Sequence, residues 1–206
     1  CPQKSVSYLK SKVKYKKKKK FIFLKKNFGV GGATIKGLQS AYNQGYDILI
    51  KFDADDQHKI VDLKKIIKKL KNKNVNFCKG YRNLSFKDSF NRNMPLIRIL
   101  GAKSLNFLSR INTNNSELRD VTNGLFGMSS GTFKKINFRE LKKDYFFEQD
   151  LIFNLSLKKI KIFQINSEVI YGDETSSLKI LNSIVPFLIC NLQNFFKKIK
   201  QDILQK

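Results

Sequence analysis

The chain has 206 residues and a formal net charge of +25, from 41 Lys and Arg against 16 Asp and Glu. Its hydrophobic share of 41% and aromatic share of 12%, mostly Phe, are too high for a disordered chain. A chain of this length buries a substantial core within one domain. Length and composition therefore predict a single α/β domain.

The large positive charge would ordinarily indicate a polyanionic partner. Lysine supplies 35 of the basic residues and arginine only six, whereas nucleic-acid sites favour Arg for bidentate and stacked contacts. Lys, Asn, Ile and Phe are also the residues that A/T-rich codons encode. The composition argues against a nucleic-acid partner and fits attraction to anionic lipid headgroups better.

The three cysteines, Cys1, Cys78 and Cys190, are widely spaced and match no metal or disulfide pattern. This predicts that the protein resides in a reducing compartment, the cytoplasm. No signal peptide is visible. No uninterrupted apolar run is long enough to span a bilayer. We therefore expect a cytoplasmic domain.

In chain order, the first apolar run covers residues 21–24 and predicts a buried strand, preceded by a lysine-rich loop. A glycine-rich segment and a helix follow, with Ile35, Leu38 and Tyr42 on one face and Gly45 at its end. Residues 47–52 then predict a second strand. The alternation of strand, helix and strand is typical of an α/β sheet with crossover helices.

A surface helix is predicted over residues 61–70, because its apolar positions recur at i, i+3, i+4 and i+7. Those positions are Leu63, Ile66, Ile67 and Leu70. The remaining predicted elements are a strand at 76–78, a helix carrying residues 97–108, a strand at 124–128, a helix from 147 and a strand at 160–171.

The last segment, residues 178–206, predicts an amphipathic helix with Pro186 inside it. Its apolar stripe is Leu178, Leu181, Val185, Leu188, Leu192, Phe195, Ile199 and Ile203. Two interpretations stay open. The helix covers the domain or packs on a segment outside this chain, or it lies in the plane of a membrane surface with its lysines near the headgroups.

An acidic motif follows the predicted strand at 47–52, where an α/β sheet places its ligand crevice. Asp53 and Asp55 project to one side if the backbone stays extended, and a divalent cation removes their mutual repulsion. Their hard oxygens suit Mg²⁺ or Mn²⁺, and Gln57 adds a neutral oxygen ligand. The alternative, a helix cap made by Asp56, explains only one carboxylate. For His58, the only histidine, the motif implies no more than proximity to the metal.

Three segments resemble the family-2 glycosyltransferases of the GT-A fold. They are Asn27–Ala33, Ala41–Asp47 and Asp53–His58. This version of the acidic motif is closest to polyprenyl-phosphate (dolichol-phosphate-type) sugar transferases. The resemblance implies that Asp53, Asp55 and Gln57 hold Mg²⁺ or Mn²⁺ on the diphosphate of a nucleotide-sugar donor.

The resemblance also implies the other binding residues. On the donor side, the family's nucleotide loop and Gly-x-Arg motif correspond to Asn27, Gly29, Gly31, Gly32 and Arg82, beside Asp53. On the acceptor side, the family's Asp-x-x-x-Gly segment corresponds to Asp120, Asn123 and Gly124.

The segment Tyr145–Leu151 resembles the family's acidic helix start, which gives Glu148 the position of the general base and Asp150 that of a second acid. On a helical wheel, Glu148 falls within the apolar arc, whereas Gln149 points away. A carboxylate on an apolar face at a helix N-terminus is a poor structural choice and a good general base. The alternative is that Glu148 only satisfies free N–H groups there.

The implied fold is a mixed, mainly parallel sheet flanked by helices, with a catalytic domain over 1–177 and an amphipathic helix over 178–206. The family's first strand and nucleotide-binding Asp pair are absent here, and Cys1-Pro2 resembles the residues that come directly after that pair in the family. We therefore expect a further segment before Cys1. The family's Gln-x-x-Arg-Arg-Trp segment is also absent, which argues against a polysaccharide synthase.

The resulting hypothesis is an inverting transfer of a sugar to a polyprenyl-phosphate or glycan acceptor, at the cytoplasmic face of a membrane. Two alternatives belong to other classes. One is a phosphohydrolase or phosphotransferase with Asp53 as nucleophile. The other is a non-enzymatic basic protein that binds nucleic acid or membrane.

Overall fold

The computed structural model describes residues 20–55, 57–83, 96–168 and 180–204. The residues before Lys20, Asp56, the predicted helix position Leu178 and the side chain of Leu181 are not described. The strands are β1 (Ile48–Lys51), β2 (Phe77–Tyr81), β3 (Phe126–Ser129) and β4 (Ile162–Asn166). The helices are α2 (Gly29–Asn43), α3 (Ile60–Leu70), α5 (Leu96–Thr113), α6 (Ser130–Lys135), α7 (Phe147–Leu157) and α8 (Ile180–Leu204).

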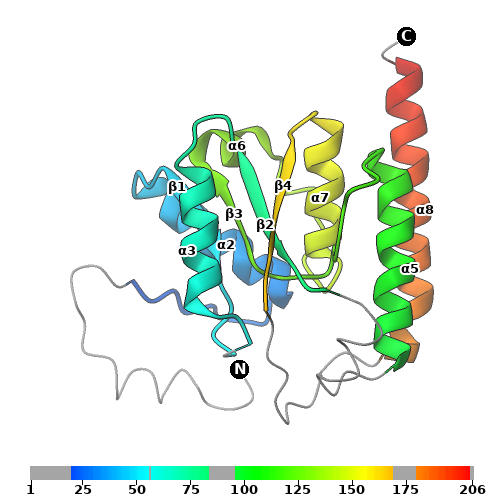
Figure 1. Cartoon of the computed structure of the whole chain (residues 1–206), viewed down its shortest axis with the longest axis horizontal. Helices are drawn as coiled ribbons and strands as arrows, with labels where there is room; N and C mark the ends of the chain where they lie inside the picture. Colours follow the sequence, from blue (N-terminus) through cyan, green and yellow to red (C-terminus); the bar gives the residue numbers. More distant parts are fainter. Residues whose placement is uncertain (1–19, 56, 84–95, 169–179, 205–206) are drawn as a thin grey trace.

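The strands form one open sheet in the order β1-β3-β2-β4, with helices on both faces (Figure 1). β3 runs antiparallel to both of its neighbours, with Leu49 opposite Met128 and Cys78 opposite Gly127. β2 and β4 are parallel. The prediction of a mixed α/β sheet is confirmed.

Three of the four described strands, β1, β2 and β4, share one direction, as the expected mainly parallel sheet requires. The fourth, β3, is reversed and lies between β1 and β2, so two of the three described pairings are antiparallel. Because β1, β2 and β4 still point the same way, their carboxyl ends meet at one edge of the sheet, which is the lower edge in Figure 1.

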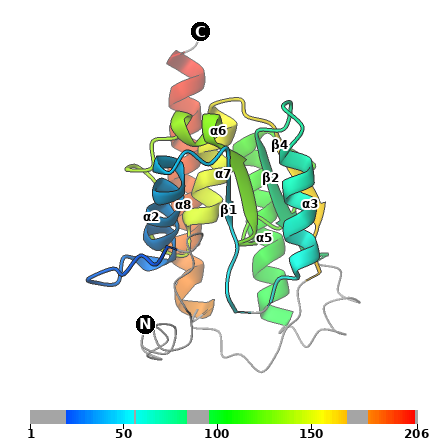
Figure 2. The same cartoon turned by 90° about the vertical axis from the view of Figure 1, so that its left-hand side faces the viewer.

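Alternate residues of each strand supply two cores, as the period of two in a strand requires. On one face, Leu49, Phe77 and Phe126 pack with residues of α2 and α7. On the other face, Cys78 and Leu125 pack with residues of α3 (Figure 2). Each helix is thus held by burial of apolar surface against the sheet.

The pair of helices α5 and α8 lies beyond α7, at the side of the molecule (Figure 1). Asn112 of α5 donates a hydrogen bond to the Asn191 side chain of α8 at 3.2 Å. Lys198 of α8 donates one to Ile111 O at 3.0 Å. None of the helices within the described ranges is long and apolar enough to cross a membrane.

One predicted strand is wrong. Residues 21–24 form no strand, and Ile22 and Phe23 are exposed. A strand needs a neighbour for its backbone hydrogen bonds, and in the described part of the chain β1 pairs only with β3. The short helix α6 was not predicted from the sequence. Its N-cap residue is Ser129, whose Oγ accepts a hydrogen bond from the backbone N–H of Thr132.

Candidate active site

Side chains from β1 and α7 meet at the carboxyl edge of the sheet. The Nζ of Lys51, the last residue of β1, lies 2.7 Å from Asp53 Oδ2 and 3.3 Å from Glu148 Oε1. The same ammonium donates a hydrogen bond of 3.2 Å to Gly124 O. Lys51 and Glu148 are both buried. The structure therefore brings Asp53 and Glu148, which are far apart in the sequence, to one cation.

Gly124 closes this cluster at a position where a side chain would not fit. A Cβ added there would lie 2.6 Å from Lys51 Nζ and 2.7 Å from Asp53 Oδ2. It would also lie 3.8 Å from Glu148 Oε1. The segment expected on the acceptor side thus directly borders Asp53.

Asp55 and Gln57 lie on the outer side of the same loop. Asp55 is exposed, and its Oδ1 accepts a hydrogen bond of 3.2 Å from the backbone N–H of Gln57. In the described ranges, no group of three or more His, Cys, Asp and Glu side chains could hold a metal. Two carboxylates and an amide oxygen nevertheless fit Mg²⁺ or Mn²⁺, because such ions are commonly held by one or two carboxylates together with substrate phosphates.

Glu148 has the environment of a general base. Burial raises the pKa of Glu148, and the nearby Lys51 ammonium opposes that rise. A carboxylate with a raised pKa binds a proton more readily than an ordinary one. The structure confirms that Glu148 is buried, as its place within the apolar arc predicts.

Asp150, the predicted second acid, has its contacts elsewhere. Its Oδ2 accepts a hydrogen bond of 2.9 Å from the backbone N–H of Lys142, and its Oδ1 accepts one of 3.3 Å from Asn154 Nδ2. Burial raises the pKa of Asp150. These partners belong to the loop before α7 and to α7 itself, which gives Asp150 a structural function. A catalytic function stays a prediction.

Gln149 does not point away from the protein, and that expectation is wrong. It is buried, and its Nε2 donates hydrogen bonds to Ser109 Oγ at 3.1 Å and to Asn191 Oδ1 at 2.7 Å. The reason is tertiary: α7 has the sheet on one side and α5 and α8 on the other, so it is buried nearly all round.

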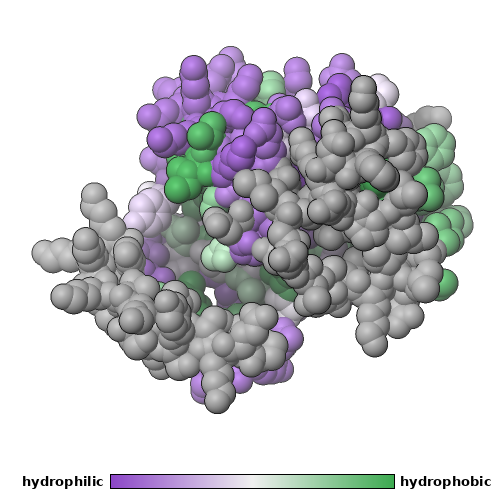
Figure 3. Space-filling model, turned by 60° about the horizontal axis from the view of Figure 1, so that its bottom comes forward, coloured by the Kyte–Doolittle hydropathy of each residue, from purple (hydrophilic) through white to green (hydrophobic). Residues whose placement is uncertain are grey.

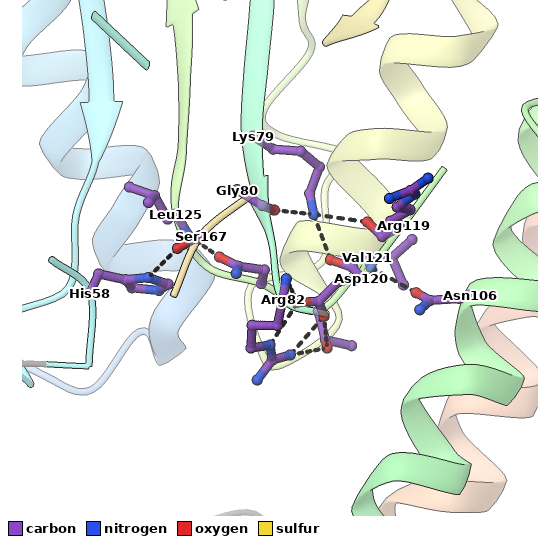
Figure 4. Close-up of polar contacts among 12 residues, drawn as sticks. His58, Lys79, Gly80, Arg82, Asn106, Arg119, Asp120, Val121, Leu125 and Ser167 are labelled. Carbon is purple, nitrogen blue, oxygen red and sulfur yellow. Dashed lines mark hydrogen bonds and ion pairs between the residues drawn. The ribbon is translucent and has the colours of Figure 1, made fainter. Parts of the chain in front are cut away.

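Arg82 and Asp120 form a buried ion pair at the end of β2 (Figure 4). Arg82 Nε donates to Asp120 Oδ2 at 2.6 Å, and Arg82 Nη2 donates to Oδ1 at 2.7 Å. Burial raises the pKa of Asp120, but the Arg82 guanidinium outweighs it and lowers that pKa to about 2. The resemblance implies that Arg82 faces the phosphate groups of the donor, whereas in this structure its guanidinium is paired with Asp120.

Lys79 of β2 lies next to this pair and binds the backbone on both sides of it. Its Nζ donates hydrogen bonds to the carbonyl groups of Gly80, Arg119 and Asp120 (Figure 4). Complete burial lowers the pKa of Lys79 to about 8, against the opposing charge of Asp120. A lysine within an otherwise apolar strand is a sequence signal for a buried, paired cation. Both Lys51 and Lys79 show this signal, but the sequence-based prediction did not include them.

Asn123, expected on the acceptor side, is buried beside Gly80. Its Oδ1 accepts a hydrogen bond of 2.9 Å from the backbone N–H of Leu125, which fixes the turn before β3. Its Nδ2 has no hydrogen-bond partner within the described ranges.

His58 joins the acidic loop to the last strand. Its Nδ1 lies 3.3 Å from Ser167 Oγ (Figure 4). That hydroxyl donates a hydrogen bond of 3.0 Å to Asp62 Oδ2. Burial lowers the pKa of His58. These contacts give His58 a structural function near the site. Nothing in the sequence indicated Ser167, and Asp62 looked like an ordinary charge in the first turn of a helix.

The predicted nucleotide-side residues at the start of α2 are Asn27, Gly29, Gly31 and Gly32. The glycines were expected in a loop, but they lie inside the first turns of α2. The backbone N–H groups of Gly31 and Gly32 donate to Lys143 O, and a Cβ on Gly31 would lie 2.6 Å from Phe147. The glycines therefore let α2 pack closely on α7. Their contact with a nucleotide stays a prediction.

This sheet and its acidic edge define the class of protein. The chain belongs to glycosyl transferase family 2, whose family model matches residues 2–139.

Two curated relatives are similar over most of the chain. The UDP-N-acetylglucosamine–dolichyl-phosphate N-acetylglucosaminyltransferase of Methanococcus voltae is 31% identical over 163 residues, which are 79% of this chain and 63% of that protein. An uncharacterized protein of Methanocaldococcus jannaschii is 30% identical over 178 residues, 86% of this chain and 69% of that protein. The chain thus spans about two thirds of the length of these relatives.

Solved structures of glucosyl-3-phosphoglycerate synthase from Mycobacterium tuberculosis share the fold. The complex with Mn²⁺, UDP-glucose and glycerol 3-phosphate aligns with a TM-score of 0.56 and 14% identity, over 79% of this chain and 55% of that chain. The complex with phosphoglyceric acid aligns with a TM-score of 0.57 and 12% identity, over 82% of this chain and 56% of that chain.

Proposed function

We propose that this chain transfers a sugar from a nucleoside-diphosphate sugar to a polyprenyl-phosphate or glycan acceptor, with inversion and with a divalent metal. The observation that carries this proposal is the meeting of Asp53 and Glu148 around Lys51. It supports the proposal because the carboxylate proposed to hold the metal and a carboxylate with a raised pKa lie at the same edge of the sheet.

Asp53, Asp55 and Gln57 would hold Mg²⁺ or Mn²⁺. Such an ion neutralises the charge that builds up on the diphosphate leaving group. The crystal structure of the M. tuberculosis enzyme, which shares this fold, is a complex with Mn²⁺, UDP-glucose and glycerol 3-phosphate.

For a hydroxyl acceptor, Glu148 would remove the proton as the acceptor oxygen attacks the anomeric carbon from the face opposite the diphosphate. A polyprenyl phosphate is already anionic and hardly needs a base. The name of the M. voltae relative, a dolichyl-phosphate N-acetylglucosaminyltransferase, favours the lipid phosphate.

We further propose that α8 rests on a membrane surface. All but one of the exposed apolar residues of α8 lie on one side and are here called the α8 stripe: Val185, Leu188, Ile189, Leu192, Phe195, Phe196, Ile199 and Ile203; Leu204, at the end of the helix, is exposed outside it. At 100° per residue the residues of the stripe occupy one arc of about 120°. The side of α8 that faces the protein carries Asn191 and Asn194 together with Phe187 and Cys190. Hydrophobic residues gather along the right-hand edge of Figure 3, where α8 lies.

The test compares Asp55→Asn with Glu148→Gln, using UDP-N-acetylglucosamine, Mn²⁺ and a polyprenyl phosphate. Asp55→Asn should lower activity by at least about a hundredfold, the size of loss typical for a group that stabilises transition-state charge. Glu148→Gln should retain most activity with the lipid phosphate and lose it with a sugar hydroxyl acceptor. Asp202→Asn, on exposed α8, is the control. Full activity of Asp55→Asn would show the metal proposal to be wrong.

A further inference from the structure

A hollow of about 410 Å³ opens next to the proposed active site, between the end of β2, the segment before Asp120 and α5. Asp120, which lines it, is paired with Arg82. Three further cationic side chains line the hollow: Lys103 and Arg110 from α5, and Arg119. The lining therefore carries an excess of positive charge at the edge of the sheet where the acidic loop also lies.

Arg119 is held in place from two sides. Its guanidinium lies 5.0 Å from the centre of the Tyr81 ring, and its Nη1 donates a hydrogen bond of 3.2 Å to the Tyr81 hydroxyl. Its backbone N–H donates to Gln164 Oε1 at 2.8 Å. A guanidinium fixed in this way loses little conformational entropy when it binds an anion.

Arg110 is fixed in a similar way. Its Nε donates a hydrogen bond of 2.7 Å to Leu118 O, and its two Nη groups stay outside that bond. Within the ranges that the structure describes, neither Arg110 nor Arg119 forms an ion pair with a carboxylate. Two positioned guanidinium groups without a carboxylate partner are chemically suited to binding a phosphate group.

One wall of the hollow is apolar and leads outward. Phe107 of α5 lines the hollow and is 62% exposed. Leu100 and Ile111 lie seven residues before it and four after it, so all three share one face of α5, and all are exposed. Exposed apolar side chains in a row mark a surface that binds an apolar partner.

We infer that this hollow binds the phosphate group of a lipid phosphate acceptor, with Arg110 and Arg119 on the phosphate and Phe107 against the first part of the hydrocarbon chain. This inference rests on the proposed function and assigns the acceptor to particular residues. A nucleotide would have no use for the exposed apolar face of α5, whereas an amphiphile with an anionic head matches both parts of the site.

The test uses the full chain and farnesyl phosphate, a short and soluble polyprenyl phosphate, with affinity measured by titration calorimetry. The double variant Arg110→Gln/Arg119→Gln should weaken binding by at least about tenfold, because charge-assisted hydrogen bonds are lost. Lys64→Gln/Lys68→Gln on the exposed side of α3 removes the same charge elsewhere and should change affinity by less than about twofold, since exposed charges more than a Debye length away are screened.

A second pair of measurements separates the lipid from free phosphate. Phe107→Ser should weaken farnesyl phosphate binding by roughly tenfold, as expected when an aromatic contact is lost, and leave inorganic phosphate binding unchanged. If the wild-type chain binds inorganic phosphate as tightly as farnesyl phosphate, and Phe107→Ser affects neither, the hollow is a free-phosphate site and the lipid assignment is wrong. Equal affinities in Arg110→Gln/Arg119→Gln and its control would overturn the site itself.

Circular dichroism checks that each variant folds. If the double variant does not fold, Arg119→Gln alone carries the test, because its exposed side chain contacts the surface of Tyr81. Mn²⁺-dependent binding of UDP-N-acetylglucosamine is measured on the same proteins and should persist in all of them. If the wild type does not bind UDP-N-acetylglucosamine, the proposed function is wrong. If it does, and Arg110→Gln/Arg119→Gln binds farnesyl phosphate as tightly as the wild type, only this inference is wrong.

Discussion

Lys51 is the residue on which the proposed active site depends. Its buried ammonium stands between Asp53 and Glu148, two carboxylates that would otherwise repel each other. A buried cation is tolerated when it is paired and hydrogen-bonded, as Lys51 is by these carboxylates and by Gly124 O. Because Gly124 has no side chain, all three charged groups fit in one place.

We expect Gly124→Ala to disrupt this arrangement. The added methyl would collide with Lys51 Nζ and Asp53 Oδ2, so the ends of these two side chains must move from their present positions. Donor binding with Mn²⁺ should weaken by at least about tenfold, and the free energy of unfolding should fall by about 1–3 kcal/mol, the usual result of overpacking. Titration calorimetry and urea unfolding measure the two effects.

Gly37→Ala is the matched control for that substitution. Gly37 lies on α2, where an added Cβ meets nothing within 4 Å. Alanine there should raise the free energy of unfolding by about 0.5–1 kcal/mol through its better helix propensity, with donor binding unchanged. If Gly124→Ala binds the donor as tightly as the wild type does, Asp53 does not take part in donor binding.

At the scale of elements, α8 combines polar and apolar contacts on its inner side. There Asn191 bonds to Asn112 and Gln149, and Phe187 and Cys190 are buried, while most other apolar side chains of the helix are exposed. Polar contacts of this kind fix one orientation of a helix, because a rotated helix would bury amide groups without partners. The inward polar side therefore fixes the outward direction of the α8 stripe.

If the α8 stripe rests on a membrane, Leu192→Ser/Phe196→Ser should reduce binding to phosphatidylglycerol vesicles by at least about tenfold, since two large apolar side chains no longer enter the lipid. The free energy of unfolding should stay within about 0.5 kcal/mol, because both residues are exposed. Vesicle sedimentation and urea unfolding provide the two measurements.

Ile22→Ser/Tyr46→Ser serves as the control, since it removes two exposed apolar side chains that lie outside the α8 stripe. Vesicle binding that falls equally in both double variants would reflect general hydrophobicity and contradict an oriented contact through α8. High salt should weaken binding in all the proteins, because the net charge of +25 contributes attraction that salt screens.

For the whole molecule, the buried pair of Arg82 and Asp120 links folding to pH. The folded pKa of Asp120, about 2, lies below the ordinary value of 3.8. The unfolded chain therefore binds the proton first as the pH falls, so the stabilisation is complete above about pH 4 and is lost between about pH 4 and 2. At about 1.4 kcal/mol per pKa unit, the pair contributes on the order of 2 kcal/mol.

Asp120→Asn should accordingly lower the free energy of unfolding at pH 7 by on the order of 2 kcal/mol, because it removes the charge partner of the partly buried Arg82. The difference between variant and wild type should shrink as the pH falls from 4 toward 2. Urea unfolding over this pH range tests both statements. The raised pKa values of Glu148 and Asp150 increase the free energy of unfolding as the pH falls. Both carboxylates are present in the wild type and in Asp120→Asn, so their effect cancels when the two proteins are compared.

Asp202→Asn, at an exposed position of α8, removes a carboxylate without an Arg partner in the described structure. It should leave the free energy of unfolding within about 0.5 kcal/mol at every pH. A pH-independent difference between Asp120→Asn and the wild type would show that the Arg82 pair does not control acid stability.

Several parts of the fold and site follow from local pattern alone. The apolar periodicity of residues 61–70 predicts α3, and the apolar run at 47–52 predicts β1, because burial of one face requires such spacing. The acidic motif after β1 and the burial of Glu148 on α7 are predicted in the same way. These features need no knowledge of distant contacts.

Other features depended on contacts that local pattern does not record. Residues 21–24 have the composition of a strand but no neighbouring strand in the described structure. The reversal of β3 between β1 and β2 is set by how the sheet is assembled. Gln149 looks exposed on a helical wheel, yet α5 and α8 cover it.

By itself, the sequence determined the family, the α/β class and the presence of an acidic metal-type motif with a candidate base, because these depend on residue type and short spacing. Only the tertiary structure decided that Asp53 and Glu148 share Lys51, that Arg82 is paired with Asp120, and that cationic side chains of α5 line a hollow beside them. The physical reason is that ion pairs and binding sites depend on distances of a few ångströms between residues that chain order leaves far apart.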